Sequence, residues 1–97
     1  MNELEISTLL PALKTLIVKE CDKEFAPESI EDNERLIGGR LELDSLDALQ
    51  ISMAVKDRYG VRIEGGPDSR KALATVTALA QFIIAESNVA QTEASRD

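Results

Sequence analysis

The residues of this chain best suited to chemistry are a serine and its acidic neighbours, in the segment Asp44-Ser45-Leu46-Asp47. From Ser45 to Tyr59 nothing breaks a helix, and Asp44 or Ser45 can cap the start of that helix. A serine hydroxyl at a helix N-terminus is exposed, and a phosphodiester on it would meet free backbone N–H groups and the positive end of the helix dipole. The segment therefore predicts a position that tolerates a covalently attached phosphate.

The side chains that usually activate such a serine are missing. The sequence has no histidine, which excludes Ser-His and Cys-His nucleophiles and histidine metal sites. Its acidic residues are scattered, without an aromatic cleft that would prepare a carboxyl group for acid catalysis. We therefore predict that the chain is not an enzyme by itself.

Composition favours a small helical domain. Of the 97 residues 43% are hydrophobic but only 3% aromatic, so the core must consist of Leu, Ile, Val and Ala, the usual material of packed helices. The net charge of -7 opposes binding to nucleic acid and favours a basic protein partner. The sequence does not begin like that of a secreted protein, contains no apolar run long enough to span a bilayer, and has a single cysteine. We therefore expect a cytoplasmic protein in which Cys21 is a buried apolar residue.

Two elements precede the serine. Apolar residues at intervals of three and four predict a first helix that ends near Asp22. Pro11 fits only a first turn, so Ser7 or Thr8 is the expected N-cap, unless the helix starts earlier and kinks. Residues 22 to 40 then predict a long loop that must pack down. Its apolar anchors are Ile30, Leu36 and Ile37.

Two more helices follow the helix that begins at Ser45. Gly60 is placed to end that helix, residues 68 to 74 can form one or two helical turns, and Thr75 can cap a last helix. The buried stripe of the last helix is expected at Val76, Leu79, Ala80, Phe82 and Ile83. From Asn88 the sequence is too polar to stay packed, which predicts a disordered tail, 88–97, after a domain of residues 1–87.

The helix from Ser45 to Tyr59 carries two apolar stripes, although a surface helix needs only one. The stripe that reads as the core face consists of Ala48, Ile51, Ser52, Val55 and Tyr59. The second consists of Leu46, Leu49 and Met53, and it begins one residue after the serine. This second stripe either widens the buried face or forms an exposed patch for partner helices.

The segment Leu43-Asp44-Ser45-Leu46-Asp47 resembles the attachment motif of acyl carrier proteins, whose modified serine lies between Asp and Leu at the start of their second helix. The run from Leu41 to Ile63, LELDSLDALQISMAVKDRYGVRI, is similar to that family's second helix and following loop, and the likeness covers about residues 3 to 87. The resemblance implies an all-α four-helix bundle with a short third helix and a long loop between helices 1 and 2.

The same resemblance implies a role for the serine. A phosphopantetheinyl transferase using Mg²⁺ would attach 4'-phosphopantetheine from coenzyme A to Ser45, and the thiol of this arm would hold acyl groups as thioesters. The implied partners are ketosynthase, acyltransferase, ketoreductase and dehydratase enzymes of fatty-acid, polyketide or aryl-polyene biosynthesis, met by a monomeric carrier in transient complexes. The implied docking residues are Asp44, Leu46, Asp47, Leu49 and Met53. The two aspartates would pair with Arg or Lys of the partners, or simply complement the helix dipole.

The sequence departs from this family at three positions. Acyl carriers often have Gly two residues before the Asp-Ser pair, where this chain has Glu42. Where the best-known fatty-acid carriers have Glu on the second helix, this chain has Gln50 and Lys56. These charges suggest a specialised pathway such as polyketide or aryl-polyene synthesis.

Two rival functions use the same residues. A carrier of amino acids or peptides usually has a Gly-Gly-x-Ser pattern, whereas Asp44 directly precedes Ser45 here. An unmodified helical adaptor would use Leu46, Leu49 and Met53 to dock a partner helix.

Overall fold

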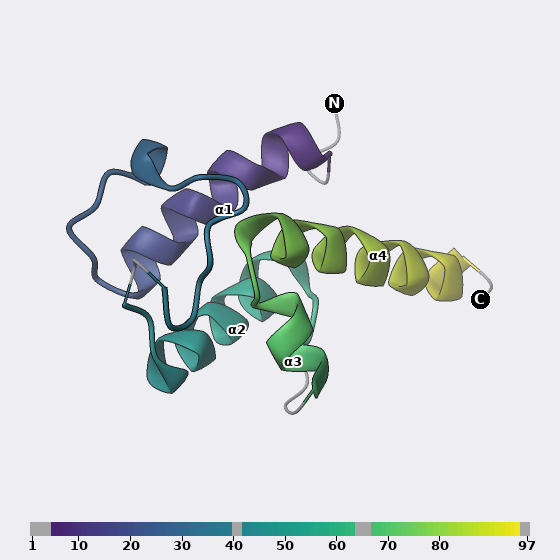
Figure 1. The fold of residues 1–97 in the computed structure, drawn as a ribbon. Helices are drawn as coiled ribbons and strands as arrows, with labels where there is room; N and C mark the ends of the chain where they lie inside the picture. Colours follow the sequence, from purple (N-terminus) through teal and green to yellow (C-terminus); the bar gives the residue numbers. More distant parts are fainter. Residues whose placement is uncertain (1–4, 40–41, 64–66, 96–97) are drawn as a thin grey trace.

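Packed helices make up the computed structural model, which describes residues 5–39, 42–63 and 67–95 (Figure 1). Within these ranges the chain forms four α-helices, one short 3-10 helix and no strand beyond two isolated bridges. The α-helices are α1 (Ile6–Glu20), α2 (Ser45–Tyr59), α3 (Pro67–Ala72) and α4 (Val76–Ser95), and the 3-10 helix is η1 (Pro27–Ser29). The predicted all-α class is confirmed for this part of the chain.

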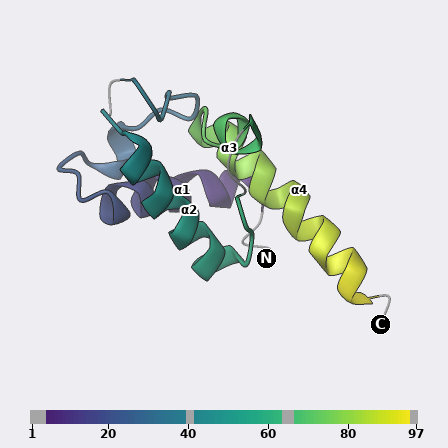
Figure 2. The same ribbon diagram turned by 90° about the horizontal axis from the view of Figure 1, so that it is seen from below.

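Helix α1 is the centre of the packing. It contacts both α2 and α4, and α3 contacts α4. The long connection from α1 to α2 runs along one side of the molecule, and the last turns of α4 extend beyond the other helices in both views (Figures 1 and 2). None of the helices in the described ranges has the combination of length and apolar content that crossing a membrane requires.

The core is almost entirely aliphatic, as the low aromatic content predicts. Each α-helix except the short α3 supplies at least two of its members, and the connecting segments supply the rest. The buried cluster consists of Leu9, Leu13, Leu16, Ile17, Cys21, Ile30, Leu36, Leu43, Ile51, Val55, Val61, Leu73, Val76, Leu79, Ala80 and Ile83.

Helix α1 begins earlier than Pro11 suggests. Its N-cap is Glu5, so the prediction of Ser7 or Thr8 as the cap is wrong and the earlier start is correct. Pro11 lies inside the helix, where its ring nitrogen cannot donate the usual backbone hydrogen bond. Leu9 on this first part of the helix is fully buried, and burying a leucine contributes about 1.5–3 kcal/mol, which offsets the missing bond.

The long loop is tied to the corner where α4 begins. The Leu36 amide donates to the Ala74 carbonyl at 3.1 Å. Farther back, the Asp32 carbonyl accepts two hydrogen bonds from Thr77, one from its amide at 2.9 Å and one from its hydroxyl at 2.8 Å. These bonds explain how so long a connection stays packed without regular structure of its own.

The loop's apolar anchors are only partly as predicted. Ile30 and Leu36 are buried, but Ile37 is exposed, so its assignment as an anchor is wrong. The backbone here is extended and makes bridges at Arg35 and Ile37, which turns successive side chains to opposite faces. With Leu36 in the core, Arg35 and Ile37 must face outward.

Helix α4 starts as predicted but ends later. The Thr75 hydroxyl accepts a hydrogen bond from the Ala78 amide at 3.0 Å, which confirms Thr75 as the cap. The predicted stripe is buried except for Phe82, which is half-buried. The backbone of α4 continues as helix to Ser95, and the disordered tail of residues 88–97 stays a prediction.

Candidate functional site

Helix α2 is capped by two aspartates. The Asp44 Oδ1 accepts a hydrogen bond from the Asp47 amide at 3.0 Å, and the Asp47 Oδ2 accepts one from the Asp44 amide at 3.1 Å. This reciprocal pair is a capping box, which sets the start of the helix at Ser45. At the other end Gly60 has φ of 70°, the left-handed conformation that ends helices, as predicted.

Ser45 is the first residue of α2, and its side chain is exposed. Because Asp44 is the N-cap, the Ser45 hydroxyl is not needed to start the helix. Asp44 also occupies backbone amides of the first turn, through its carboxylate at Asp47 and its carbonyl at Ala48. The cap therefore already occupies the Asp47 amide, and a phosphate on Ser45 would rely on the earlier amides of the first turn, the helix dipole and nearby cations.

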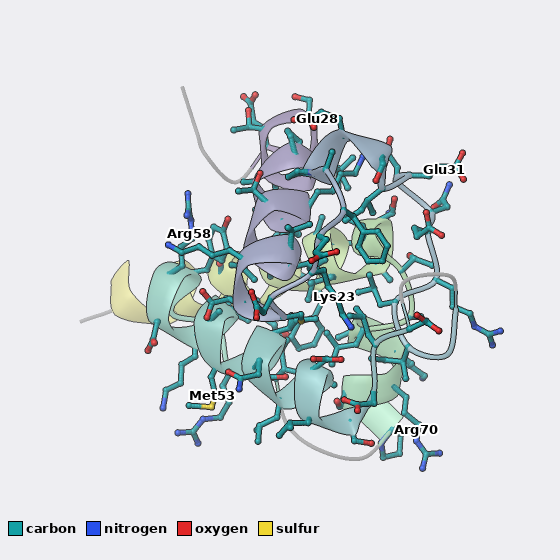
Figure 3. All side chains as sticks on the ribbon, turned by 90° about the vertical axis from the view of Figure 1, so that its left-hand side faces the viewer. Lys23, Glu28, Glu31, Met53, Arg58 and Arg70 are labelled. Atoms are coloured by element: carbon teal, nitrogen blue, oxygen red, sulfur yellow. The ribbon has the colours of Figure 1, made fainter. Side chains whose placement is uncertain are left out.

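A lysine from a distant part of the chain supplies such a cation. The hydrogen bond from the Asp47 amide is the largest cause that lowers the pKa of the Asp44 carboxyl below its ordinary value of 3.8, and the charge of Lys23 acts in the same direction. Figure 3 shows Lys23, in the segment after α1, close to the first turn of α2. The sequence offers no local signal for this proximity, because only the fold brings Lys23 near the cap of α2.

The second stripe of α2 is exposed. The exposed fractions of Leu46, Leu49 and Met53 are 64%, 54% and 57%, whereas Ile51 and Val55 on the other face are fully buried. Figure 3 shows the Met53 side chain on the outer side of the helix. The alternative of a wider buried face is therefore wrong. We name Leu46, Leu49 and Met53 the apolar stripe; three large apolar side chains together on one exposed face are typical of a contact surface.

Cys21 has a structural role beneath this site. It is buried, as predicted, and its Sγ lies 3.8 Å from the carbonyl oxygen of Asp47. Burial raises the pKa of the Cys21 thiol to about 11, with the charge of Asp47 as the next cause. The neutral thiol therefore helps to pack the end of α1 against the first turn of α2 and is a poor nucleophile.

The backbone that leads into α2 has an unusual residue in a left-handed conformation. Glu42 has φ of 56°, a value that favours glycine, and its amide donates to the Gly39 carbonyl at 3.1 Å. Asp22 is the other non-glycine residue with a positive φ in the described ranges. The turn before the serine thus demands a conformation that Glu42 adopts at some cost.

No protein-family model matches the chain, and no curated protein matches its sequence. The described residues also contain no group of three or more His, Cys, Asp or Glu side chains that could hold a metal ion. The chemistry of the site must therefore be inferred from Ser45, its capping aspartates and the apolar stripe.

Proposed function

We propose that the protein is an acyl carrier, which holds acyl groups as thioesters on a 4'-phosphopantetheine arm attached to Ser45. The observation that carries this proposal is that the cap of α2 and the exposed hydroxyl beside it belong to different residues. Asp44 and Asp47 make the cap, which leaves the Ser45 hydroxyl exposed and directly beside the apolar stripe. A serine kept only for helix capping would itself accept the hydrogen bond that Asp44 accepts.

The modification needs little from the chain beyond that hydroxyl. The Ser45 Oγ would attack the phosphorus of coenzyme A that bears the pantetheine, forming a phosphodiester and releasing adenosine 3',5'-bisphosphate, while a base of the transferase takes the hydroxyl proton. Once attached, the arm supplies a terminal thiol for thioester chemistry. The chain contributes the exposed hydroxyl of Ser45, the positive end of the α2 dipole and the nearby charge of Lys23.

Two further features support the proposal. The four helices, with a short α3 and a long loop before α2, fit the four-helix bundle that the family resemblance implies. Glu42 is left-handed at the position where acyl carriers often have glycine, so the turn before the serine needs the backbone that a glycine supplies most easily.

The docking surface in this proposal combines the apolar stripe with the aspartates of the cap. Partner enzymes of the ketosynthase, acyltransferase, ketoreductase and dehydratase kinds would insert apolar side chains between Leu46, Leu49 and Met53, and the transferase would approach the same end of α2. Gln50 and Lys56 are both exposed on α2. They make this helix less acidic than the second helix of the best-known fatty-acid carriers. We therefore infer a specialised set of partners, of the polyketide or aryl-polyene type.

Intact mass tests the proposal directly. The full chain is incubated with coenzyme A, Mg²⁺ and a phosphopantetheinyl transferase of broad specificity, beside the variants Ser45→Ala and Ser52→Ala. We expect the mass of the arm on the wild type and on Ser52→Ala, and none on Ser45→Ala. An unmodified wild type, with a known carrier modified in the same tube, would overturn the proposal.

One rival function has an observation in its favour. The exposed apolar stripe would serve equally well in a helical adaptor that is never modified. The mass experiment separates the two functions, because an adaptor gains nothing from the transferase. An aminoacyl or peptidyl carrier would gain the arm, and loading with acyl or aminoacyl donors distinguishes that case.

A further inference from the structure

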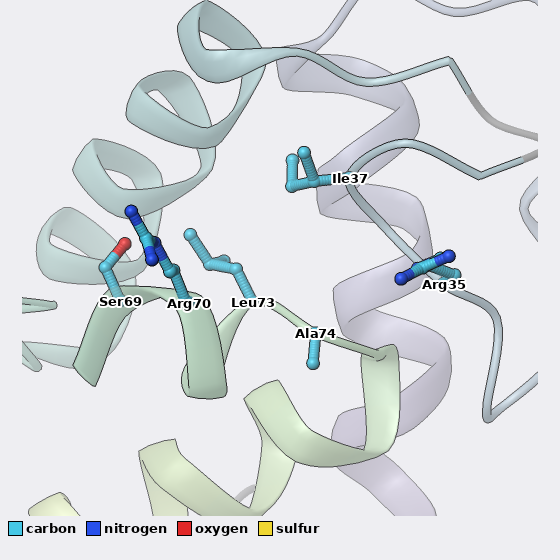
Figure 4. Close-up of a pocket in the computed structure, with 6 residues that line it drawn as sticks. All are labelled: Arg35, Ile37, Ser69, Arg70, Leu73 and Ala74. Carbon is cyan, nitrogen blue, oxygen red and sulfur yellow. The ribbon is translucent and has the colours of Figure 1, made fainter. Parts of the chain in front are cut away.

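A pocket of about 350 Å³ lies between the long loop and α3, and its lining does not include the residues of the apolar stripe. It is lined by Arg35, Ile37, Ser69, Arg70, Leu73 and Ala74. Its volume is at the lower end of the range of about 300–1,000 Å³ that is typical of small-molecule sites. Figure 4 shows Arg70 and Ser69 together at one end of the pocket, Arg35 at the other, and apolar side chains between them.

The two walls of the pocket are held to each other by backbone bonds. The loop wall carries Arg35 and Ile37, and the residue between them, Leu36, donates its amide to the Ala74 carbonyl on the opposite wall. Arg35 also forms an antiparallel bridge with Thr75. Because Leu36 is fully buried, the outward direction of its two neighbours is set by the core. The pocket is therefore formed in advance of any ligand.

The pocket is positively charged, although the chain as a whole is negatively charged. The net charge is -7, yet this site carries Arg35 and Arg70, and Lys71 follows Arg70 on α3. The ion pair between Lys14 and Asp32 involves neither arginine. Among the described residues these two guanidinium groups have no carboxylate partner, and beside an apolar wall they match a ligand that is apolar along its length and anionic at its end.

We propose that this pocket binds an aliphatic chain ending in a carboxylate. The hydrocarbon lies against Ile37, Leu73 and Ala74, and the carboxylate accepts hydrogen bonds from the Arg70 guanidinium and the Ser69 hydroxyl. Arg35 attracts the anion from the opposite end. The ligand is either a free fatty acid or an acid-ended acyl group on the Ser45 arm; the parallel bridge between Ile37 and Leu43 connects this wall to the segment leading into α2.

Titration with two matched probes tests the pocket in the unmodified full chain. Octanoate and octanamide have the same hydrocarbon, and only octanoate is charged. We expect octanoate to shift the backbone NMR signals of Ser69, Leu73 and Ala74, and octanamide to bind about tenfold more weakly because it cannot form the charge-assisted pair. Equal affinity of the two probes, no saturable shift with octanoate, or shifts confined to the apolar stripe would overturn the proposal.

Variants locate the anion. Arg70→Gln should weaken octanoate binding about tenfold, and Arg35→Gln by a smaller factor that disappears at high salt. Lys71→Gln is the matched control, since it removes the same charge from the same helix outside the pocket lining, and it should bind octanoate like the wild type. If Lys71→Gln loses as much affinity as Arg70→Gln, the effect is general charge and the site does not exist. Ser69→Ala, with a smaller expected loss, gives a second test should Arg70→Gln unfold.

A last comparison separates the two sources of the ligand, and this comparison alone rests on the proposed function. The Ser45 arm is loaded with an octanoyl or an octanedioyl group, which differ in the terminal carboxylate. The same NMR shifts with octanedioyl, and not with octanoyl, would assign an acid-ended cargo to the pocket. If neither loaded form gives the shifts while free octanoate does, the ligand is a free fatty acid. A chain that is never modified can still bind octanoate, so the two proposals fail separately.

Discussion

Asp44 and Asp47 each accept a hydrogen bond from the other's backbone amide, at 3.0 and 3.1 Å, so two like charges stabilise one helix end together. The positive end of the helix dipole and Lys23 offset their mutual repulsion. This arrangement also separates structure from function at the site. The aspartates make the helix start, and the serine between them stays available.

The capping pair predicts a specific pH dependence. The pKa of the Asp44 carboxyl is lowered in the folded protein, so its charge contributes stability that is fully present above the ordinary value of 3.8 and is lost as pH falls through the lower folded value. Asp44→Asn keeps the hydrogen-bond acceptor and removes the charge. The variant should therefore melt at a lower temperature than the wild type at pH 7, and the gap should close in acid. Thermal melts followed by circular dichroism between pH 7 and 2 measure this, with Asp57→Asn as a control for loss of one carboxylate. A gap that stays constant across the range would contradict the prediction.

The left-handed turn before the serine predicts the effects of two substitutions at Glu42. A side chain in this conformation costs about 1–2 kcal/mol, which glycine avoids. Part of that gain is lost, because glycine also increases the conformational entropy of the unfolded chain. Glu42→Gly should therefore raise the free energy of unfolding by up to about 1 kcal/mol, and Glu42→Val should lower it, because a branched side chain fits this region worst. Urea titrations give both values. Glu24→Gly, in the same loop without a positive φ, should be destabilising; a matching gain there would remove the explanation.

The exposure of the apolar stripe predicts that stability and docking respond differently to Met53→Glu. The melting temperature should stay close to that of the wild type, and the rates of modification and loading by partner enzymes should fall. Val55→Glu, in the fully buried face of the same helix, should destabilise the protein by several kcal/mol. Gln81→Glu adds the same charge to exposed surface on α4 and should leave the loading rate unchanged. Equal loading by Met53→Glu and the wild type would show that the stripe is not used for docking.

The burial of Cys21 predicts the number of reactive thiols. At pH 8 its thiol is neutral and covered, because its pKa is raised to about 11. The unmodified protein should therefore react slowly with a disulfide reagent in its native state and quickly in denaturant. Protein that carries the Ser45 arm should show one fast thiol under native conditions, and Cys21→Ala should keep that fast thiol. A fast thiol in the unmodified native protein would mean that Cys21 is accessible after all.

Charge on α2 predicts partner choice. Enzymes with basic docking patches lose attraction at Gln50 and meet a like charge at Lys56, so a generic fatty-acid elongation set should use the proposed carrier slowly. The double variant Gln50→Glu and Lys56→Glu should be elongated faster, with a gain that shrinks as salt shortens the screening length below about 10 Å. A competition between the two modified proteins, read by mass spectrometry at low and high salt, measures the ratio. Identical rates at low salt would remove the basis for specialised partners.

Local signals explain which parts of this fold were predictable. Helix α2 was placed correctly because the residue next to each of its ends is a local signal: Asp44 caps the start, and Gly60 adopts a left-handed conformation after the end. The start of α1 was not, because the burial of Leu9 by distant helices outweighs the local preference of Pro11. The loop was anticipated in length, but Ile37 was assigned to the core because only the buried position of Leu36 determines which way its neighbours face.

The site was predictable to the same extent. Ser45 and the apolar stripe are contiguous or lie at helical spacing, so their grouping on α2 could be anticipated from sequence, whereas the exposure of the stripe had to come from the fold. The role of Asp47 in the cap could also have been found, since an acidic residue three positions after Asp44 is the signal of a capping box. Lys23 and the arginines of the pocket could not, because the fold brings them to their positions from separate segments.

The double hydrogen bond from Thr77 to the Asp32 carbonyl has a consequence for how the chain acquires its shape during synthesis. The two residues are far apart in the sequence, so the loop's last constraints form only after the corner that begins α4 has left the ribosome. Until then α1 and α2 can be complete helices while the connection between them is still unanchored. The serine would then be present on a nascent chain before the surface around it is complete, and modification during translation would meet a different substrate from the finished protein.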